Sequence, residues 1–194
     1  MKIVNFAEKN SELNRFVAEI RDIHIQQDRL RFRKNLERIG EVMSYEISKD
    51  FRYSEKLVTT PLGTARVNTA DDKIVIGTIL RAGIPYHQGF LNYFDRAENA
   101  FVSAYRKYKD KLNFEIFIEY IASPRIDGKI LILTDPMLAT GGSMELSYRA
   151  LLTKGEPEEK TTVWVGAIDP DLNEHSYIVP GLGDAGDLAY GEKE

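Results

Sequence analysis

The segment "ILILTDPMLATGGSMELSYRALL", residues 130–152, constrains the fold of this chain more than any other part of the sequence. Its aliphatic run, 130–134, is typical of a strand buried on both faces of a parallel sheet. The run ends at Asp135 and Pro136, and a loop of small residues then leads into a helical pattern. The segment therefore predicts a strand, a loop and a helix in direct succession, with a carboxylate at the join.

The rest of the chain alternates predicted helices and strands. Residues 11–49 have the apolar spacing of amphipathic helices. The predicted buried stripe consists of Leu30, Leu36, Ile39, Met43 and Ile47. The cluster Arg29, Arg31, Arg33, Lys34 and Arg38 lies among these positions, and we interpret it as solvated or subunit-facing surface. Pro61 and Gly63 separate short β-prone runs and predict a hairpin at 56–68. Further strands are predicted at 73–83, 99–108, 114–122 and 161–168.

This alternation predicts an α/β protein with a doubly wound parallel sheet, N-terminal helices and a small hairpin. The chain has 194 residues, enough for one well-filled domain. We expect a single domain over 1–194. Its expected parts are a helical region at 1–55, an α/β core at 56–170 and a C-terminal loop at 171–194.

Composition excludes several classes of protein. A net charge of -4 argues against a nucleic-acid-binding protein, which would favour a basic face. The chain has no cysteine, and His24, His87 and His175 are too far apart in sequence to suggest a metal motif. No apolar run approaches the roughly 20 residues that span a bilayer, and the start of the chain lacks a signal-peptide core. We therefore expect a cytoplasmic protein with no membrane partner.

The loop at 135–143 has the features of a phosphate site. Ligands of a doubly wound sheet bind beyond the carboxyl ends of its strands, which is where this loop is expected. Small residues let the backbone approach an anion closely, and a helix that starts near Ser143 presents unpaired N–H groups. Thr140 and Ser143 add hydroxyl donors. No lysine follows the glycines, so the loop predicts a monophosphate cradle and not a nucleotide P-loop.

Charged residues at three strand ends extend this prediction. Asp135 is expected beside the cradle, where a carboxylate would accept hydrogen bonds from ribose hydroxyls. Arg81 and Arg106 end other predicted strands, and guanidinium groups match phosphate oxygens well. Together these residues indicate a phosphorylated ribose as ligand. A glycine-rich turn capped by Ser143, with Asp135 exposed at a strand end, remains the alternative.

The C-terminal segment 171–191 is rich in glycine, and Asp184 and Asp187 lie between its glycines. Such a loop exposes backbone donors and acceptors in irregular directions, which suits the recognition of a flat polar ring by its edge. Ile178, Val179 and Leu182 are too apolar for a free tail. The segment is therefore expected to pack against the domain.

Two stretches, "DPMLATGGS" and "LNEHSYIVPGLGDAGD", resemble the uracil phosphoribosyltransferases of the type I phosphoribosyltransferase superfamily. The resemblance extends to "RFRKNLERIGEVMSYEIS", "TILRAG" and "AYR", and so covers most of the chain. It implies transfer of phosphoribose from 5-phosphoribosyl 1-diphosphate (PRPP) to uracil, giving UMP and pyrophosphate in pyrimidine salvage. It also implies Mg²⁺ that is carried by PRPP, with no direct metal ligand from the protein.

The resemblance implies a role for residues of each motif. The implied catalytic residues are Asp135, Arg81 and Arg106. The implied PRPP-binding residues are Arg81, Arg106, Asp135, Pro136, Met137, Leu138, Ala139, Thr140, Gly141, Gly142, Ser143 and Asp184. The implied uracil-binding residues are Ile178, Gly183, Asp184 and Ala185. The family also forms dimers or larger assemblies, and some members respond to GTP, so a dimer or tetramer is expected and GTP is a candidate effector.

The sequence departs from the family pattern at 153–162. The family runs a further strand and helix between the helix of 144–155 and the strand at 161–168, and roughly twenty residues are absent here. The sheet is therefore expected to lose a strand beside the phosphate loop, or its neighbours must rearrange. The adjacent pair Asp135 and Pro136 matches the uracil enzymes, whereas most of the superfamily has two acidic residues there.

Two other functions stay open on the sequence alone. A non-catalytic regulator that binds PRPP, a nucleotide or RNA is supported by a basic stretch with interleaved tyrosines. That stretch consists of Tyr105, Arg106, Lys107, Tyr108, Lys109 and Lys111. The second alternative is a phosphoribosyltransferase for another pyrimidine base. A general base at His175 is disfavoured, because no partner residue is evident in the sequence.

Overall fold

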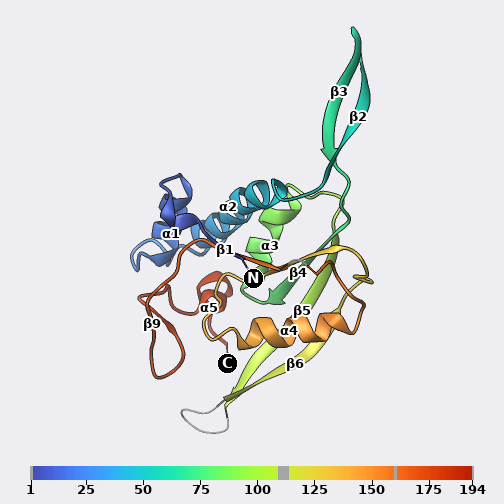
Figure 1. Cartoon of the computed structure of the whole chain (residues 1–194). Coiled ribbons are helices and arrows are strands. Elements are labelled where there is room, and N and C mark those ends of the chain that lie inside the picture. Colours follow the sequence, from blue (N-terminus) through green and yellow to red (C-terminus); the bar gives the residue numbers. More distant parts are fainter. Residues whose placement is uncertain (1, 109–113, 160, 194) are drawn as a thin grey trace.

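The computed structural model describes residues 2–108, 114–159 and 161–193, with the backbone alone described at 105–108 and 114–117 (Figure 1). Its helices are α1 (Leu13–Arg21), α2 (Arg29–Ser48), α3 (Gly83–Leu91), α4 (Gly142–Leu152) and α5 (Ala185–Tyr190), and one turn of 3-10 helix lies at Phe6–Glu8. Its strands are β1 (Lys2–Asn5), β2 (Tyr53–Thr60), β3 (Gly63–Ala70), β4 (Ile74–Leu80), β5 (Glu98–Tyr108), β6 (Phe114–Ala122), β7 (Ile130–Thr134), β8 (Thr162–Val165), β9 (Asp171–Leu172) and β10 (Ile178–Val179).

The central sheet has the strand order β6-β5-β4-β7. Strands β4, β5 and β7 run parallel, which confirms the parallel sheet predicted from the aliphatic runs. Strand β6 runs antiparallel to β5, because their connection is too short for the crossover that a parallel pair needs. The sheet is therefore mixed. The carboxyl ends of β4 and β7 lie side by side at one edge.

Helices cover both faces of this sheet. Helix α3 packs on β4 and β7 and is backed by α2, whereas α4 packs on β4, β5 and β6 from the other side (Figure 1). Helices α2 and α3 approach closely at Gly40, where a Cβ atom would lie 2.4 Å from the backbone oxygen of Tyr86. This arrangement confirms the doubly wound fold and leaves the carboxyl edge of the strands uncovered for a site.

Helix α2 supplies much of the core that supports α3. The predicted stripe is confirmed at Leu36, Ile39, Met43 and Ile47, which are all buried. It is wrong at Leu30, which is 62% exposed, because the first turn of α2 precedes the crossing with α3. Phe32, which the spacing did not include, is buried instead.

The predicted hairpin is confirmed as β2 and β3, which are longer than the predicted 56–68. Its strands pair antiparallel from Tyr53↔Ala70 to Thr60↔Gly63. Figure 1 shows the hairpin projecting away from the domain, and almost all of its residues are exposed. None of the helices in the described ranges has the length and apolar character to cross a bilayer.

The strand predicted at 161–168 forms as β8, but it does not join the central sheet. It pairs in parallel with β1 in a separate two-stranded sheet. The segment between α4 and β8 instead bonds to the residues just before β7: the amides of Ile126 and Gly128 donate to the carbonyls of Lys154 and Glu156. Within the described part of the chain, β7 pairs with β4 alone, so its outer edge has no strand partner. The expected loss of a strand next to the phosphate loop is thus visible in the fold.

Candidate active site

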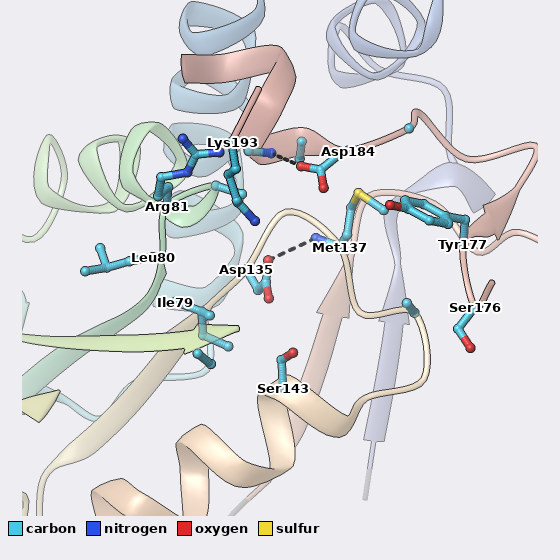
Figure 2. Close-up of a pocket in the computed structure, with 16 residues that line it drawn as sticks. Ile79, Leu80, Arg81, Asp135, Met137, Ser143, Ser176, Tyr177, Asp184 and Lys193 are labelled. Atoms are coloured by element: carbon cyan, nitrogen blue, oxygen red, sulfur yellow. Dashed lines mark hydrogen bonds between the residues drawn. The ribbon is translucent and has the colours of Figure 1, made fainter. Parts of the chain in front are cut away.

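A cavity of about 390 Å³ lies at the carboxyl edge of the central sheet (Figure 2). Its walls come from the end of β4 at residues 79–82, from Ala104 of β5, from the loop after β7 and the start of α4, and from the C-terminal segment. This is the place where a doubly wound sheet presents its loops to a ligand.

The loop after β7 makes a tight turn into α4. Gly141 has φ 78°, a left-handed conformation that favours glycine, and its amide donates to the carbonyl of Leu138 at 2.8 Å. Ala139 also has a positive φ, 45°. Helix α4 begins at Gly142, and no side chain caps it at Gly141. Ser143 lies inside the first turn, lines the cavity and does not cap the helix, so the capped-turn alternative is wrong. The amide of Gly142 donates to Oγ1 of Thr140 at 3.4 Å, and this first turn lies at the positive end of the helix dipole, which suits an anion.

Asp135 stands directly after β7 and faces the cavity (Figure 2). Its Oδ1 accepts a hydrogen bond from the amide of Met137 at 3.3 Å. Burial raises the pKa of the Asp135 carboxyl to about 7, although the bond from Met137 acts in the opposite direction. A carboxyl with such a pKa binds or releases a proton near neutral pH.

Arg81 follows β4 and reaches the C-terminal segment. Its Nη2 donates to Oδ1 of Asp187 at 2.9 Å and to the carbonyl of Gly191 at 3.3 Å. Its Nε is buried and has no hydrogen-bond partner within the described part of the chain. Gly186 lies beside the guanidinium, where a Cβ atom would be in ordinary contact with Nη2 at 3.7 Å. The guanidinium thus lines the cavity and keeps one donor without a partner in the described part of the chain.

The C-terminal segment forms the wall opposite α4. Gly181 has φ 55°, and a Cβ atom there would lie 2.2 Å from the carbonyl oxygen of Ile178, so this turn requires glycine. Asp184 caps α5 by accepting from the amides of Gly186 and Asp187 at 2.9 and 3.0 Å, both at its Oδ1. Figure 2 shows the other oxygen of Asp184 on the cavity side. Backbone and carboxylate groups thus face the cavity together.

Comparison with known sequences identifies this arrangement. The family model described as "Uracil phosphoribosyltransferase" matches residues 7–161 and 155–192. The chain belongs to the uracil phosphoribosyltransferase family. A uracil phosphoribosyltransferase of Porphyromonas gingivalis is 60% identical over 215 aligned positions, which cover 100% of both chains. One of Methanothermobacter thermautotrophicus is 38% identical over 181 positions, covering 82% of this chain and 83% of the relative.

A solved structure from Aquifex aeolicus has the same fold. It superposes with a TM-score of 0.86 at 31% identity and covers 97% of this chain and 98% of its own. The family's fold is therefore confirmed across nearly the whole chain, including the C-terminal segment.

The comparisons also locate the shortened region. The alignment with the Porphyromonas gingivalis relative has 215 positions, and this chain has 194 residues. At least 21 aligned positions therefore have no residue in this chain. The two family matches meet at 155–161, within the segment that crosses from α4 to β8. The absence of roughly twenty residues that the sequence pattern indicated is confirmed at that place.

Most of the predicted site residues of this family member meet at the cavity. The predicted residues that line it are Arg81, Asp135, Met137, Ala139, Ser143, Gly183, Asp184 and Ala185. The predicted residues of the described part that lie outside its lining are Pro136, Leu138, Thr140, Gly141, Gly142 and Ile178. Leu138 is 46% exposed, and Ile178 pairs with Leu172 of β9. Arg106 lies on β5 opposite Ile116, and its side chain is outside the described part.

Several cavity residues escaped the sequence prediction. Ser176, Tyr177 and Lys193 line the cavity, and Lys193 brings a second cation to its wall. Polar residues near the end of a chain carry no sequence signal of their own, so only the path of the backbone after α5 could place Lys193. His175 does not line the cavity, and among the described residues no group of three or more potential ligands could hold a metal ion.

Proposed function

We propose that this chain transfers the phosphoribosyl group of PRPP to uracil, giving UMP and pyrophosphate in pyrimidine salvage. The observation that carries the proposal is the convergence of three elements on one cavity: the uncapped start of α4, Arg81 after β4, and the C-terminal turn at 183–186. The chain's 60% identity to a uracil phosphoribosyltransferase over its full length supports uracil as the base.

The 5-phosphate of PRPP would bind at the first turn of α4. The N–H groups of this turn, the Ser143 hydroxyl and the positive end of the helix dipole all attract an anion. Gly141 lets the backbone turn around the phosphate without a side chain in the way, since nothing lies within 4 Å of its Cβ direction. Residues 136–142 would hold the phosphate mainly through the backbone.

Asp135 would hold the ribose hydroxyls and lie beside the reacting anomeric carbon. When the diphosphate leaves, positive charge develops on the sugar, and an ionised carboxylate nearby stabilises it. With a pKa of about 7, the Asp135 carboxyl is partly ionised at neutral pH, and its ionised form is the one that stabilises this charge. Arg81 would stabilise the negative charge on the departing diphosphate, and we assign Arg106 the same role from the sequence resemblance.

Uracil would bind against the turn at 183–185, with Ile178 behind it. Uracil presents an N3–H donor between two carbonyl groups, whereas cytosine reverses part of that edge. A backbone frame matched to uracil would leave buried groups unpaired with cytosine, which discriminates strongly. N1 of uracil would attack the anomeric carbon from the face opposite the diphosphate, the C–O bond to the diphosphate would break, and the N1 proton would pass to solvent or to the departing diphosphate.

The donor set of the cavity fits Mg²⁺ that arrives with PRPP. Asp135 and Asp184 offer carboxylate oxygens at the wall, and Mg²⁺ prefers oxygen ligands, often one or two carboxylates plus substrate phosphates. Bound in this way, the ion would neutralise charge on the diphosphate. Asp184 and Asp135 are the side chains of this chain that would face it.

The test is product formation from Mg²⁺-PRPP with uracil, cytosine, hypoxanthine and orotate, separated by chromatography. We expect UMP from uracil alone. Asp135→Asn should lower kcat at least about 100-fold, because the carboxylate charge is lost where positive charge develops. Asp95→Asn is the matched control, since Asp95 is exposed and does not line the cavity.

The outcomes separate the competing functions. Product from another base would replace uracil in the proposal and leave the reaction type intact. No product from any base, with PRPP still bound, would overturn the enzymatic proposal in favour of a non-catalytic regulator. RNA binding that weakens with added salt would then test the basic stretch at 105–111, which lies outside the described side chains.

We further propose that the chain forms a homo-oligomer through the β2–β3 hairpin. An isolated two-stranded hairpin is marginally stable in water, and this one exposes Leu57, Val58 and Leu62. The apolar stripe of α2 is buried within its own chain, so it is not available for an interface. Light scattering should show a dimer or tetramer, and Leu57→Glu should shift it to monomer. A wild-type monomer would overturn this part of the proposal.

A further inference from the structure

Lys193 lies at the wall of the cavity, beyond the end of α5. Figure 2 shows its side chain pointing into the cavity on the side of Arg81, across from Ser143 and the start of α4. Nothing in the sequence pattern assigned it a role. It forms no ion pair with any of the residues that the structure describes, so its ammonium group is available to a ligand.

The backbone that leads to Lys193 is held in place. Arg33 of α2 donates to the carbonyl of Ala189 at 2.7 Å, and Arg81 donates to the carbonyl of Gly191 at 3.3 Å. Gly191 then turns the chain with φ 94°, a conformation that favours glycine. Lys193 follows this anchored turn by two residues, so the fold itself directs it to the cavity.

The charge balance of the cavity wall is consistent with a role for Lys193 in binding an anion. In its described lining, Asp135 and Asp184 are balanced by Arg81 and Lys193, and Arg81 is already paired with Asp187. PRPP carries a monophosphate and a diphosphate. The start of α4 serves one phosphate group, and the opposite wall must serve the other with few free positive charges.

We propose that Lys193 binds the diphosphate group of PRPP, next to Arg81, and stabilises it as it leaves. This inference rests on the proposed function. It assigns the two cations of the C-terminal wall to the diphosphate and the start of α4 to the 5-phosphate. The C-terminal segment then contributes to both substrates, with its turn at 183–185 for the base and Lys193 for the diphosphate.

The experiment measures binding of two probes, pyrophosphate and ribose 5-phosphate, by calorimetry in the presence of Mg²⁺. Lys193→Gln should weaken pyrophosphate binding about 10-fold to 100-fold, the range of a charged hydrogen bond, and leave ribose 5-phosphate unchanged. Lys193→Arg should restore most of the affinity. Lys9→Gln, which removes the same charge before α1 and away from the cavity, should change neither.

Enzyme assays of the same variants separate this inference from the function itself. Lys193→Gln should raise the KM for PRPP and the inhibition constant of pyrophosphate together, with the KM for uracil unchanged. An active wild type with unchanged pyrophosphate binding in Lys193→Gln would overturn the role of Lys193 alone. Equal weakening of both probes would also overturn it, because it would indicate a general loss of structure. An inactive wild type would overturn the proposed function, and pyrophosphate binding would still decide whether Lys193 is an anion ligand.

Discussion

Strands β4 and β7 are neighbours with similar composition, yet their environments differ. Strand β4, "IVIGTIL", is buried over its middle five residues, whereas the aliphatic positions of β7, "ILILT", are all partly exposed. Strand β4 has β5 on one side and β7 on the other, whereas β7 pairs with β4 alone among the strands of the described residues. An aliphatic run therefore predicts a strand that is suited to burial on both faces, but the neighbouring elements determine how much of it is buried.

The cause lies in the segment that follows α4. At least 21 alignment positions of the Porphyromonas gingivalis relative have no counterpart in this chain, and the family matches meet at 155–161. That length suffices for one strand, one short helix and their turns. Here the chain crosses directly to β8 and reaches only the entrance of β7, where the amide of Glu158 donates to the carbonyl of Lys129 at 3.0 Å. An aliphatic strand edge is left open, which natural sheets ordinarily avoid.

The largest expected effect comes from filling that edge. The segment that the relative has and this chain lacks, when inserted at 155–161, should stabilise the protein. It would cover the partly exposed side chains of 130–133. If burial of the apolar surface at each of these four positions contributes roughly 1 kcal/mol, the free energy of unfolding should increase by about 4 kcal/mol. The melting temperature should then rise by about 8–16 °C for a chain of this size. Differential scanning calorimetry measures the change.

A glycine-serine insert of equal length at the same place is the control for this experiment. It relaxes the crossing without adding a strand, and should leave the melting temperature unchanged or lower. Equal effects of the two inserts would contradict the comparison, since β7 would then gain nothing from a neighbouring strand. Light scattering of both proteins would also report whether the open edge of β7 promotes self-association.

The second prediction compares two isoleucines that face each other in register. Ile76 of β4 is fully buried, and its partner Ile132 of β7 is partly exposed. Ile76→Ala should cost about 4 kcal/mol of unfolding free energy and Ile132→Ala about 2 kcal/mol, because the second site already contacts solvent. Urea unfolding measures both. In the chain with the inserted segment, the two losses of unfolding free energy should become similar. If they still differ, the difference arises from the strands and not from the missing neighbour of β7.

The sequence predicted the parts of the fold that local patterns determine. The aliphatic runs located β4 and β7, and the spacing of Leu36, Ile39, Met43 and Ile47 located the buried face of α2. The pairing of strands in space was harder to predict from the sequence. Strand β8 pairs with β1 outside the central sheet, and β6 runs antiparallel to β5. At the site, Arg81 and Asp135 were predicted because a charge at a strand end stands out, and Asp184 was predicted from the family resemblance. Lys193 was missed because its place depends on the anchoring of a distant turn by Arg33 and Arg81.

The third prediction concerns Asp135, the carboxyl at the end of β7. Its pKa is raised to about 7 in the folded protein, so the folded state binds a proton that the unfolded state releases above its ordinary pKa of 3.8. Stability should therefore fall as pH rises from about 4 to about 7 and level off above that. Because the carboxyl is desolvated but lines a cavity and keeps some contact with solvent, we expect an effect of about 1–2 kcal/mol.

The measurement is the melting temperature of wild type and Asp135→Asn between pH 5 and pH 8. The melting temperature of the wild type minus that of Asp135→Asn should fall as pH rises, because only the wild type loses stability through this group. His87, whose pKa is lowered by burial, contributes an opposite slope equally to both proteins. Glu19 of α1, whose pKa is held down by a hydrogen bond from Asn35, titrates below this window. Parallel curves would show that Asp135 keeps an ordinary pKa and would remove it as a proton-exchanging group in the site.

The smallest effect separates a helix start that serves the fold from one that serves the ligand. Asp28 caps α2 by accepting from the amides of Leu30 and Arg31 at 3.0 and 3.1 Å, whereas α4 has no side-chain cap. Asp28→Ala should cost about 1 kcal/mol in urea unfolding and leave the KM for PRPP unchanged. Ser143→Ala should do the reverse, because its hydroxyl would bind the 5-phosphate and supports no cap. A stability loss in Ser143→Ala equal to that of Asp28→Ala would mean that the start of α4 is built for the helix and not for an anion.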